Sequence, residues 1–203
     1  MSASSCSSAA AAAEPFAPAP AAGDAPLMLS VSGARGIVGA TMTPAIAADF
    51  AAAFGTIVRE RAAADASADP AAGPPLVVLG RDSRPSGAML ADAVRAGLLS
   101  VGCRVLDLGI VATPTAGIMV VQRGAAAGMV VTASHNPAPW NGLKCLDSRG
   151  VAPSRADAEA LIAAFHARRI GYAAVGSIPA AEHDDSGHRV HVEFSPARGA
   201  DVV

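Results

Sequence analysis

Residues 130–144, VVTASHNPAPWNGLK, contain a serine, a histidine, two asparagines and a lysine directly after an apolar run. Each of these side chains could take part in phosphate binding or proton transfer. Ser134 stands at the end of that run, where a hydroxyl can stay clear of the backbone. A serine hydroxyl is a weak nucleophile, so it needs a general base or an incoming phosphoryl donor. In an extended chain the neighbouring His135 points away from Ser134, which makes it a poor base for a catalytic triad. The residues alone leave open a reactive serine or a Ser/His/Asn loop that only caps a turn.

Cationic side chains occur in other Gly- and Ser-rich stretches of the chain. Arg35 lies in SGARGIVG, Arg81 and Arg84 flank Asp82 in GRDSRPSG, and Lys144 follows Asn-Gly. Each has a plain alternative to a functional role. Arg35 could be a surface cation and Lys144 a solvated strand lysine. For Asp82 and Arg84 the favoured interpretation is a local ion pair that shapes the turn.

The surrounding pattern alternates between strands and helices. Thr43 is expected as the N-cap of the first helix, with Pro44 at its first position. We predict an α/β fold with a mixed, mainly parallel sheet sandwiched between helices. The expected strands span 27–33, 76–80, 103–109, 127–133 and 142–150, and the expected helices span 44–65, 87–100, a stretch ending near 123–124, and 155–169.

Ligands of such sheets gather beyond the carboxyl ends of the strands. The loops expected there are rich in Gly, Ser, Thr, Arg and His. We therefore expect four loops to converge on one rim, namely 33–39, 80–84, 109–115 and 132–137.

Composition excludes several classes of protein. The 203 residues are 52% hydrophobic but only 3% aromatic, and a net charge of −2 without any Lys/Arg cluster gives no footprint for nucleic acid. No apolar run is long enough to span a bilayer. Residues 1–26 lack the features of a signal peptide, and because they are mostly Ala, Ser and Pro they are expected to be a disordered tail. Cys6, Cys103 and Cys145 match no zinc pattern, and the last two are expected to be buried thiols. A cytoplasmic setting fits.

The motifs, taken in their order along the chain, resemble those of a known family. TASHNP followed by NGLK resembles the active-site loop of the α-D-phosphohexomutases, which include phosphoglucosamine mutase, phosphomannomutase and phosphoglucomutase. SVSGARGIVGATMTP, VVLGRDSRPSG and GCRVLDLGIVATPT resemble the family's preceding loops, in the same order. The resemblance covers roughly residues 27–150. No G-x-S-x-G elbow is present, which weighs against an acyl-transferring serine hydrolase.

The resemblance implies a role for each of several residues. Ser134 would carry a phosphoryl group and pass it to a hexose phosphate, through a hexose 1,6-bisphosphate, so that phosphate moves between the 1- and 6-positions. Arg35 would offset its charge, while Lys144 and His135 would assist proton transfer. The remaining candidates are expected to bind substrate, namely Asn136, Asn141, Arg81 and Arg84.

The resemblance also implies parts that these residues do not supply. The family's Mg²⁺ is held by the phosphoserine oxygen, here on Ser134, and by three aspartates of a second domain whose motif is absent; DDSGHR at 184–189 has the wrong spacing. We expect residues 27–172 to form the first domain, and residues 173–203 to be a linker and the start of another. The chain would then be an N-terminal piece, inactive alone. SVSGARGIVG leans toward phosphoglucosamine mutase; phosphomannomutase, phosphoglucomutase or a non-catalytic sugar-phosphate binding module are the alternatives.

Overall fold

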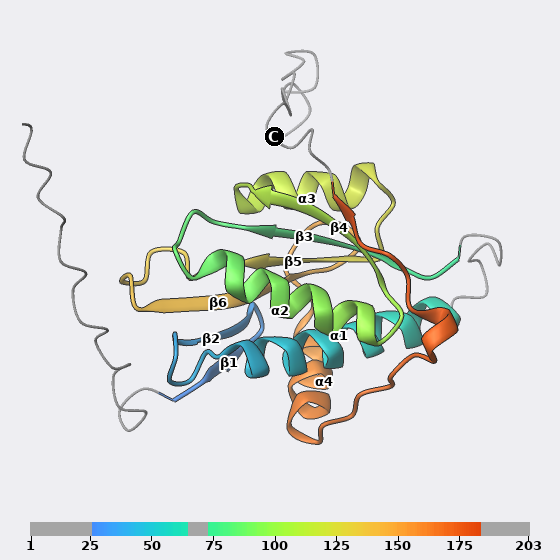
Figure 1. Cartoon of the computed structure of the whole chain (residues 1–203), viewed down its shortest axis with the longest axis horizontal. Helices are drawn as coiled ribbons and strands as arrows, with labels where there is room; N and C mark the ends of the chain where they lie inside the picture. Colours follow the sequence, from blue (N-terminus) through green and yellow to red (C-terminus); the bar gives the residue numbers. More distant parts are fainter. Residues whose placement is uncertain (1–25, 65–72, 184–203) are drawn as a thin grey trace, which may run out of the picture.

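The computed structural model describes residues 26–64 and 73–183 (Figure 1). Residues 1–25, most of the expected N-terminal tail, lie outside the described residues, as do residues 184–203 with their DDSGHR stretch. Within the described part, no helix combines the length and the apolarity needed to cross a membrane.

One mixed sheet forms the centre of the described region. Its strands run in the order β1-β2-β6-β5-β3-β4-β7. Strand β3 pairs in parallel with β4 and β5, and β4 pairs in parallel with β7, whereas the β1–β2, β2–β6 and β5–β6 pairs are antiparallel. The strands are β1 Met28–Ser30, β2 Gly33–Ile37, β3 Leu76–Arg81, β4 Arg104–Ile110, β5 Ala127–Val131, β6 Trp140–Leu146 and β7 Glu182–His183.

Among the described residues, four helices cover the sheet: α1 Pro44–Ala64, α2 Gly87–Ser100, α3 Thr113–Gln122 and α4 Arg155–His166. A 3₁₀ turn, η2, spans Val175–Ser177. The expected cap of the first helix is confirmed, because Thr43 Oγ1 accepts a hydrogen bond from the amide of Ile46 at 3.2 Å. Helices α2 and α3 connect the parallel strands β3, β4 and β5, as parallel pairing requires a crossover. The α/β class and the mixed sheet between helices are thereby confirmed.

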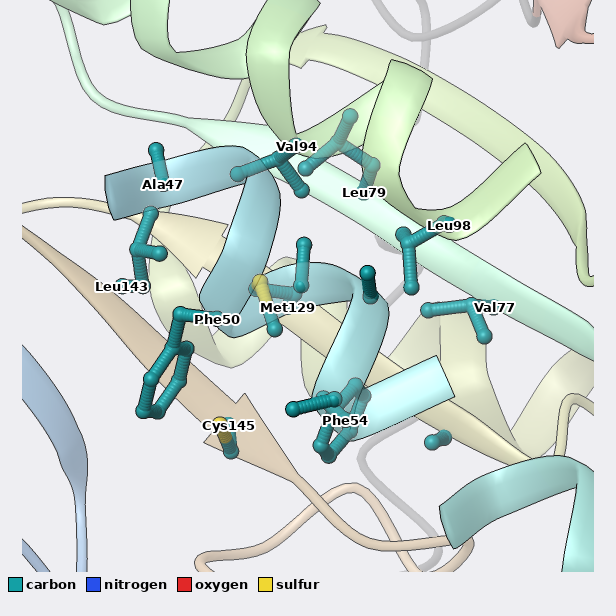
Figure 2. Close-up of a cluster of buried hydrophobic side chains, with 14 of the residues drawn as sticks. Ala47, Phe50, Phe54, Val77, Leu79, Val94, Leu98, Met129, Leu143 and Cys145 are labelled. Atoms are coloured by element: carbon teal, nitrogen blue, oxygen red, sulfur yellow. The ribbon is translucent and has the colours of Figure 1, made fainter. Parts of the chain in front are cut away.

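The two faces of the sheet bury separate apolar clusters, because successive side chains of a strand point to opposite faces. Val77 and Leu79 of β3 join the cluster under α1 and α2, whereas Val78 between them joins the cluster under α3. Figure 2 shows the larger cluster, in which α1 and α2 face the sheet. The two helices approach closely at Gly97, where a Cβ would lie 2.4 Å from the carbonyl oxygen of Ala48. Small residues thus let an aromatic-poor chain pack tightly.

The first of the four expected loops is largely a strand. Residues 33–37 form β2, which places Arg35 opposite Gly142 of β6. The prediction of a loop was wrong because it relied on the Gly-rich composition of GARGI. Here glycine permits close backbone contact: Gly33 has φ +118°, and a Cβ there would lie 1.9 Å from the carbonyl oxygen of Leu143. Arg35 is therefore held on a paired strand.

The two cysteines inside the fold should be inert. Cys103 and Cys145 are free and buried, as expected, and burial raises their pKa values to about 11 and about 12. Because the thiolate is the nucleophile, neither should react with a maleimide at pH 7.5 until the chain unfolds. Peptide mass analysis after labelling in buffer and in urea measures this site by site. Labelling of Cys145 in buffer as fast as in urea would contradict the buried environment.

Candidate functional site

Ser134 sits in a tight turn directly after β5. The turn is closed by a hydrogen bond from the amide of Asn136 to the carbonyl of Ala133 at 3.1 Å. Ser134 has φ 57°, in the left-handed region, which costs a non-glycine residue about 1–2 kcal/mol. Its amide donates to Thr132 Oγ1 at 3.0 Å, and its side chain is exposed. The hydroxyl is therefore accessible on a turn whose conformation must be held by its neighbours.

His135 lies closer to Ser134 than an extended chain would allow. Its Nδ1 is 3.5 Å from Ser134 Oγ, at the outer limit of a hydrogen bond. The expectation that His135 points away was wrong, because the left-handed residue turns the chain at this point. The imidazole of His135 therefore lies beside the hydroxyl of Ser134.

A small pocket of about 60 Å³ brings Ser134 together with Arg35 and Lys144. These three candidates come from a turn and two strands, and the pocket lining includes no carboxylate. Two cations beside one hydroxyl make a site suited to a doubly charged anion. The complete lining is Ser32, Ala34, Arg35, Thr113, Thr132, Ser134, Leu143 and Lys144.

Strand alternation explains why the two cations face the same pocket. Leu143 and Cys145 of β6 point into the cluster under α1 and α2, so Lys144 between them points to the opposite face. Ala34 also lies in that cluster, so Arg35 shares the face of Lys144. On this face α3 packs against β3 and β5, with Thr113 at its start bordering the pocket. The cations thus occupy β2 and β6, beside the start of α3.

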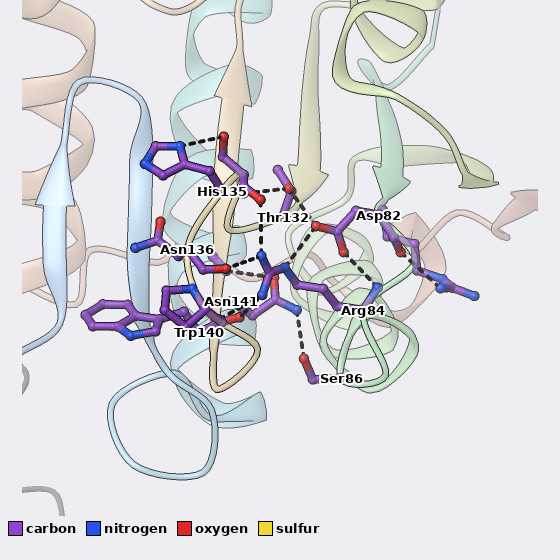
Figure 3. A network of polar contacts seen from close by, with 12 residues as sticks. Asp82, Arg84, Ser86, Thr132, His135, Asn136, Trp140 and Asn141 are labelled. Atoms are coloured by element: carbon purple, nitrogen blue, oxygen red, sulfur yellow. Dashed lines mark hydrogen bonds and ion pairs between the residues drawn. The ribbon is translucent and has the colours of Figure 1, made fainter.

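Arg84 lies in the β3–α2 loop, and its side chain extends toward the serine turn (Figure 3). Its Nη1 donates to the carbonyl oxygens of Pro137 at 3.0 Å and Trp140 at 3.1 Å. Its Nη2 donates to those of Ser134 at 3.1 Å and Asn136 at 2.6 Å. The guanidinium therefore binds four backbone carbonyls of the Ser134 segment.

Asp82 connects this guanidinium to the turn by a second route. It accepts hydrogen bonds from the amide of Arg84 at 3.0 Å and from Arg84 Nε at 3.3 Å. It also accepts from the hydroxyl of Thr132 at 2.7 Å, and that hydroxyl in turn accepts from the amide of Ser134. The expected local ion pair of Asp82 and Arg84 is present and extends into the serine turn.

The other candidate residues occupy different environments. Asn136 accepts a hydrogen bond from Arg35 Nη1 at 3.2 Å, which joins the turn to β2. Asn141 is fully buried: its Nδ2 donates to Ser86 Oγ at 2.9 Å and its Oδ1 accepts from the amide of Gly142. Arg81 donates to the carbonyl oxygen of Asp82 at 3.3 Å. The structure gives Asn141 no surface to offer a substrate, so its expected binding role is replaced by a packing role.

Sequence reasoning pointed to the right loops but missed individual residues in them. Thr113 and Thr132 fall inside loops expected at the rim, yet a threonine after a strand carries no signal of its own. Ser32 was missed because the strand was expected to run through it. Among the described residues, no group of three or more His, Cys, Asp or Glu side chains is arranged to hold a metal ion.

The buried role of Asn141 has a measurable consequence. Asn141→Ala should lower the free energy of unfolding by about 1–3 kcal/mol, because it leaves the buried amide of Gly142 and the half-buried hydroxyl of Ser86 without their hydrogen-bond partner. Urea denaturation followed by circular dichroism measures the change. Asn136→Ala, in the half-buried turn, is the matched control and should cost less. Equal losses in the two variants would contradict the assignment.

Comparison with known proteins shows which family this chain resembles. Residues 27–170 match the family described as phosphoglucomutase/phosphomannomutase, alpha/beta/alpha domain I. A phosphoglucomutase/phosphomannomutase of Thermococcus kodakarensis is 44% identical over 123 residues, which cover 59% of this chain and 24% of that protein. A phosphoglucosamine mutase of Leuconostoc citreum is 42% identical over 118 residues, which cover 58% of this chain and 24% of that protein.

A solved structure agrees with these sequence matches. A phosphoglucomutase/phosphomannomutase family protein of Burkholderia thailandensis superposes with a TM-score of 0.58 at 27% identity, covering 77% of this chain and 33% of that one. The matched part thus spans about a quarter of the length of the two curated relatives. The chain belongs to the phosphoglucomutase/phosphomannomutase family and carries its α/β/α domain I.

Proposed function

We propose that Ser134 carries the transferred phosphate of a phosphohexomutase. The observation that supports this most directly is the pocket in which the exposed Ser134 meets Arg35 and Lys144 without a carboxylate. A phosphoserine carries about −1.5 to −2 charges at pH 7, and a second anion must approach it during transfer. Both would be repelled by a carboxylate and are attracted by the two cations.

The requirements of phosphoryl transfer fit these residues. The transition state spreads charge over the equatorial oxygens of the phosphoryl group, so positioning and charge stabilisation contribute most of the catalysis. Arg35 is a planar donor suited to two phosphate oxygens, and its bond to Asn136 holds it beside the turn. Lys144 supplies the second charge. Both side chains line the same pocket as Ser134.

The proposed step exchanges one P–O bond for another. The bond from phosphorus to Ser134 Oγ breaks, a bond from phosphorus to a sugar hydroxyl oxygen forms, and the hydroxyl proton passes to the imidazole of His135, while Lys144 supplies positive charge. Oγ takes up a proton from His135. The resulting hexose 1,6-bisphosphate returns its other phosphate to Ser134 by the reverse step, so the net change is an isomerisation.

The substrate is a hexose phosphate in this proposal. Relatives are named phosphoglucosamine mutase and phosphoglucomutase/phosphomannomutase, and we favour glucosamine 6-phosphate to glucosamine 1-phosphate among these. Phosphate on Ser134 would also provide one oxygen ligand for Mg²⁺, but the described residues offer no group of three or more His, Cys, Asp or Glu side chains to complete such a site. The division into a domain at 27–172 and a following linker stays a prediction.

Labelling of Ser134 tests the central proposal. Incubation with glucose 1,6-bisphosphate should add one phosphate to the chain, detected by intact mass and located by peptide mapping. Ser134→Ala should abolish the addition, whereas Ser148→Ala, in an exposed turn, should leave it unchanged. Binding of the sugar phosphate without any labelling would favour a binding module and contradict the proposal.

The two pocket cations are expected to contribute separately to the rate. Arg35→Gln and Lys144→Gln should each slow phosphate incorporation about 100-fold or more, since losing one electrostatic contact to a transition state costs about that much. Arg155→Gln, an exposed arginine paired with Glu159 on α4, is the control and should keep the wild-type rate. Quenched time courses followed by mass analysis give the rates. Wild-type rates in both pocket variants would remove these residues from the mechanism.

A further inference from the structure

We propose that Arg84 is a positioning residue, which holds Ser134 in the left-handed conformation from which its hydroxyl accepts and donates phosphate. This inference rests on the proposed function and adds to it a residue that does not line the pocket. It replaces the expectation that Arg84 binds substrate directly.

Arg84 has no hydrogen-bond donor left for a ligand. A guanidinium carries five N–H groups: one on Nε and two on each Nη. In the structure Nε donates to Asp82, Nη1 donates to two carbonyls and Nη2 to two more. The side chain is 16% exposed. All five donors are therefore directed at the protein, and four of them at residues 134–140.

The four carbonyls explain why a cation is needed at this place. Their oxygens converge on one point, where the negative ends of their dipoles repel one another unless a positive group lies between them. The same segment includes Ser134 with its unfavourable φ. Such a conformation persists only where the surroundings over-determine it. Arg84 supplies that restraint from a loop about 50 residues earlier in the chain, which is a tertiary contact rather than a property of the turn.

Asp82 completes the restraint. Its carboxylate binds both the backbone amide and Nε of Arg84, which fixes the direction of the guanidinium. Through Thr132 it also reaches the amide of Ser134. Arg84 thus binds the carbonyl oxygens of the turn, and Thr132 binds the amide of Ser134. The carboxylate of Asp82 positions both Arg84 and Thr132.

The variant Arg84→Lys distinguishes a positioning role of Arg84 from a role of its positive charge alone. Arg84→Lys keeps the charge but has three donors on a single nitrogen, which cannot satisfy four carbonyls and Asp82 together. We expect the rate of Ser134 phosphorylation at saturating glucose 1,6-bisphosphate to fall about 100-fold, as for a misplaced reacting group. The half-saturating concentration should change less than about threefold. Backbone order parameters of Ser134, His135 and Asn136 should fall from about 0.85 to below about 0.6.

Two further variants complete the experiment. Arg59→Lys is the matched control, because Arg59 also donates to a backbone carbonyl, that of Val101, but lies near the amino ends of the parallel strands. It should keep the wild-type rate and the wild-type order parameters in the turn. Asp82→Asn loosens the same restraint without touching Arg84, and it should slow phosphorylation in the same way. It keeps the test decisive if Arg84→Lys does not fold.

The outcomes separate this inference from the proposed function. If the wild type accepts phosphate and Arg84→Lys accepts it at the same saturated rate, the positioning role is wrong while the proposed function stands. If the variant raises only the half-saturating concentration, Arg84 binds substrate and the inference is overturned. If the wild type accepts no phosphate, the proposed function fails, and the order parameters alone then report whether Arg84 holds the turn.

Discussion

The serine turn depends on a contact between two loops that are distant in sequence. Residue 134 adopts a backbone conformation that an isolated turn would leave, and the guanidinium of Arg84 surrounds the carbonyls that this conformation brings together. The contact requires that β3 and β5 be neighbours and parallel, so that their carboxyl ends lie at the same edge. The position of the Ser134 hydroxyl therefore depends on the order of the strands in the sheet. This explains why a turn with so little apolar surface can still have a defined shape.

The electrostatics of the site follow from a second constraint, the alternation of side chains along strands. Leu143 and Cys145 of β6 are buried on the face of the sheet covered by α1 and α2, so Lys144 between them points to the opposite face. Burial on the first face thus determines where the charge on the second face appears. A shift of β6 by one residue against its neighbours would bury the lysine and expose two apolar side chains, so the register of the core and the position of the cation are fixed together.

Much of this fold could be read from the sequence, and the misses have specific physical causes. The Thr-Pro start of α1 was predicted from capping, and the expected bounds of α2, 87–100, are those observed. Ser134 and Arg84 lie in loops that the rule for parallel strands placed at the rim. β2 was missed because its pairing rests on backbone contact through glycine, which leaves no apolar alternation to detect. The position of His135 depended on one left-handed residue. The resemblance led us to expect substrate binding by Asn141 and Arg84, but only tertiary contacts show that Asn141 is buried and that every donor of Arg84 is used.

The size of the pocket limits which part of a hexose phosphate could enter it. Pockets that enclose a drug-sized ligand usually measure about 300–1,000 Å³, whereas this one measures about 60 Å³, room for about two water molecules. A phosphoryl group is the part of a hexose phosphate that suits such a space and its two cations. Under the proposed function the sugar ring would lie outside this pocket, against surfaces other than its lining. The residues that choose between glucosamine, mannose and glucose would then be separate from those that handle the phosphate.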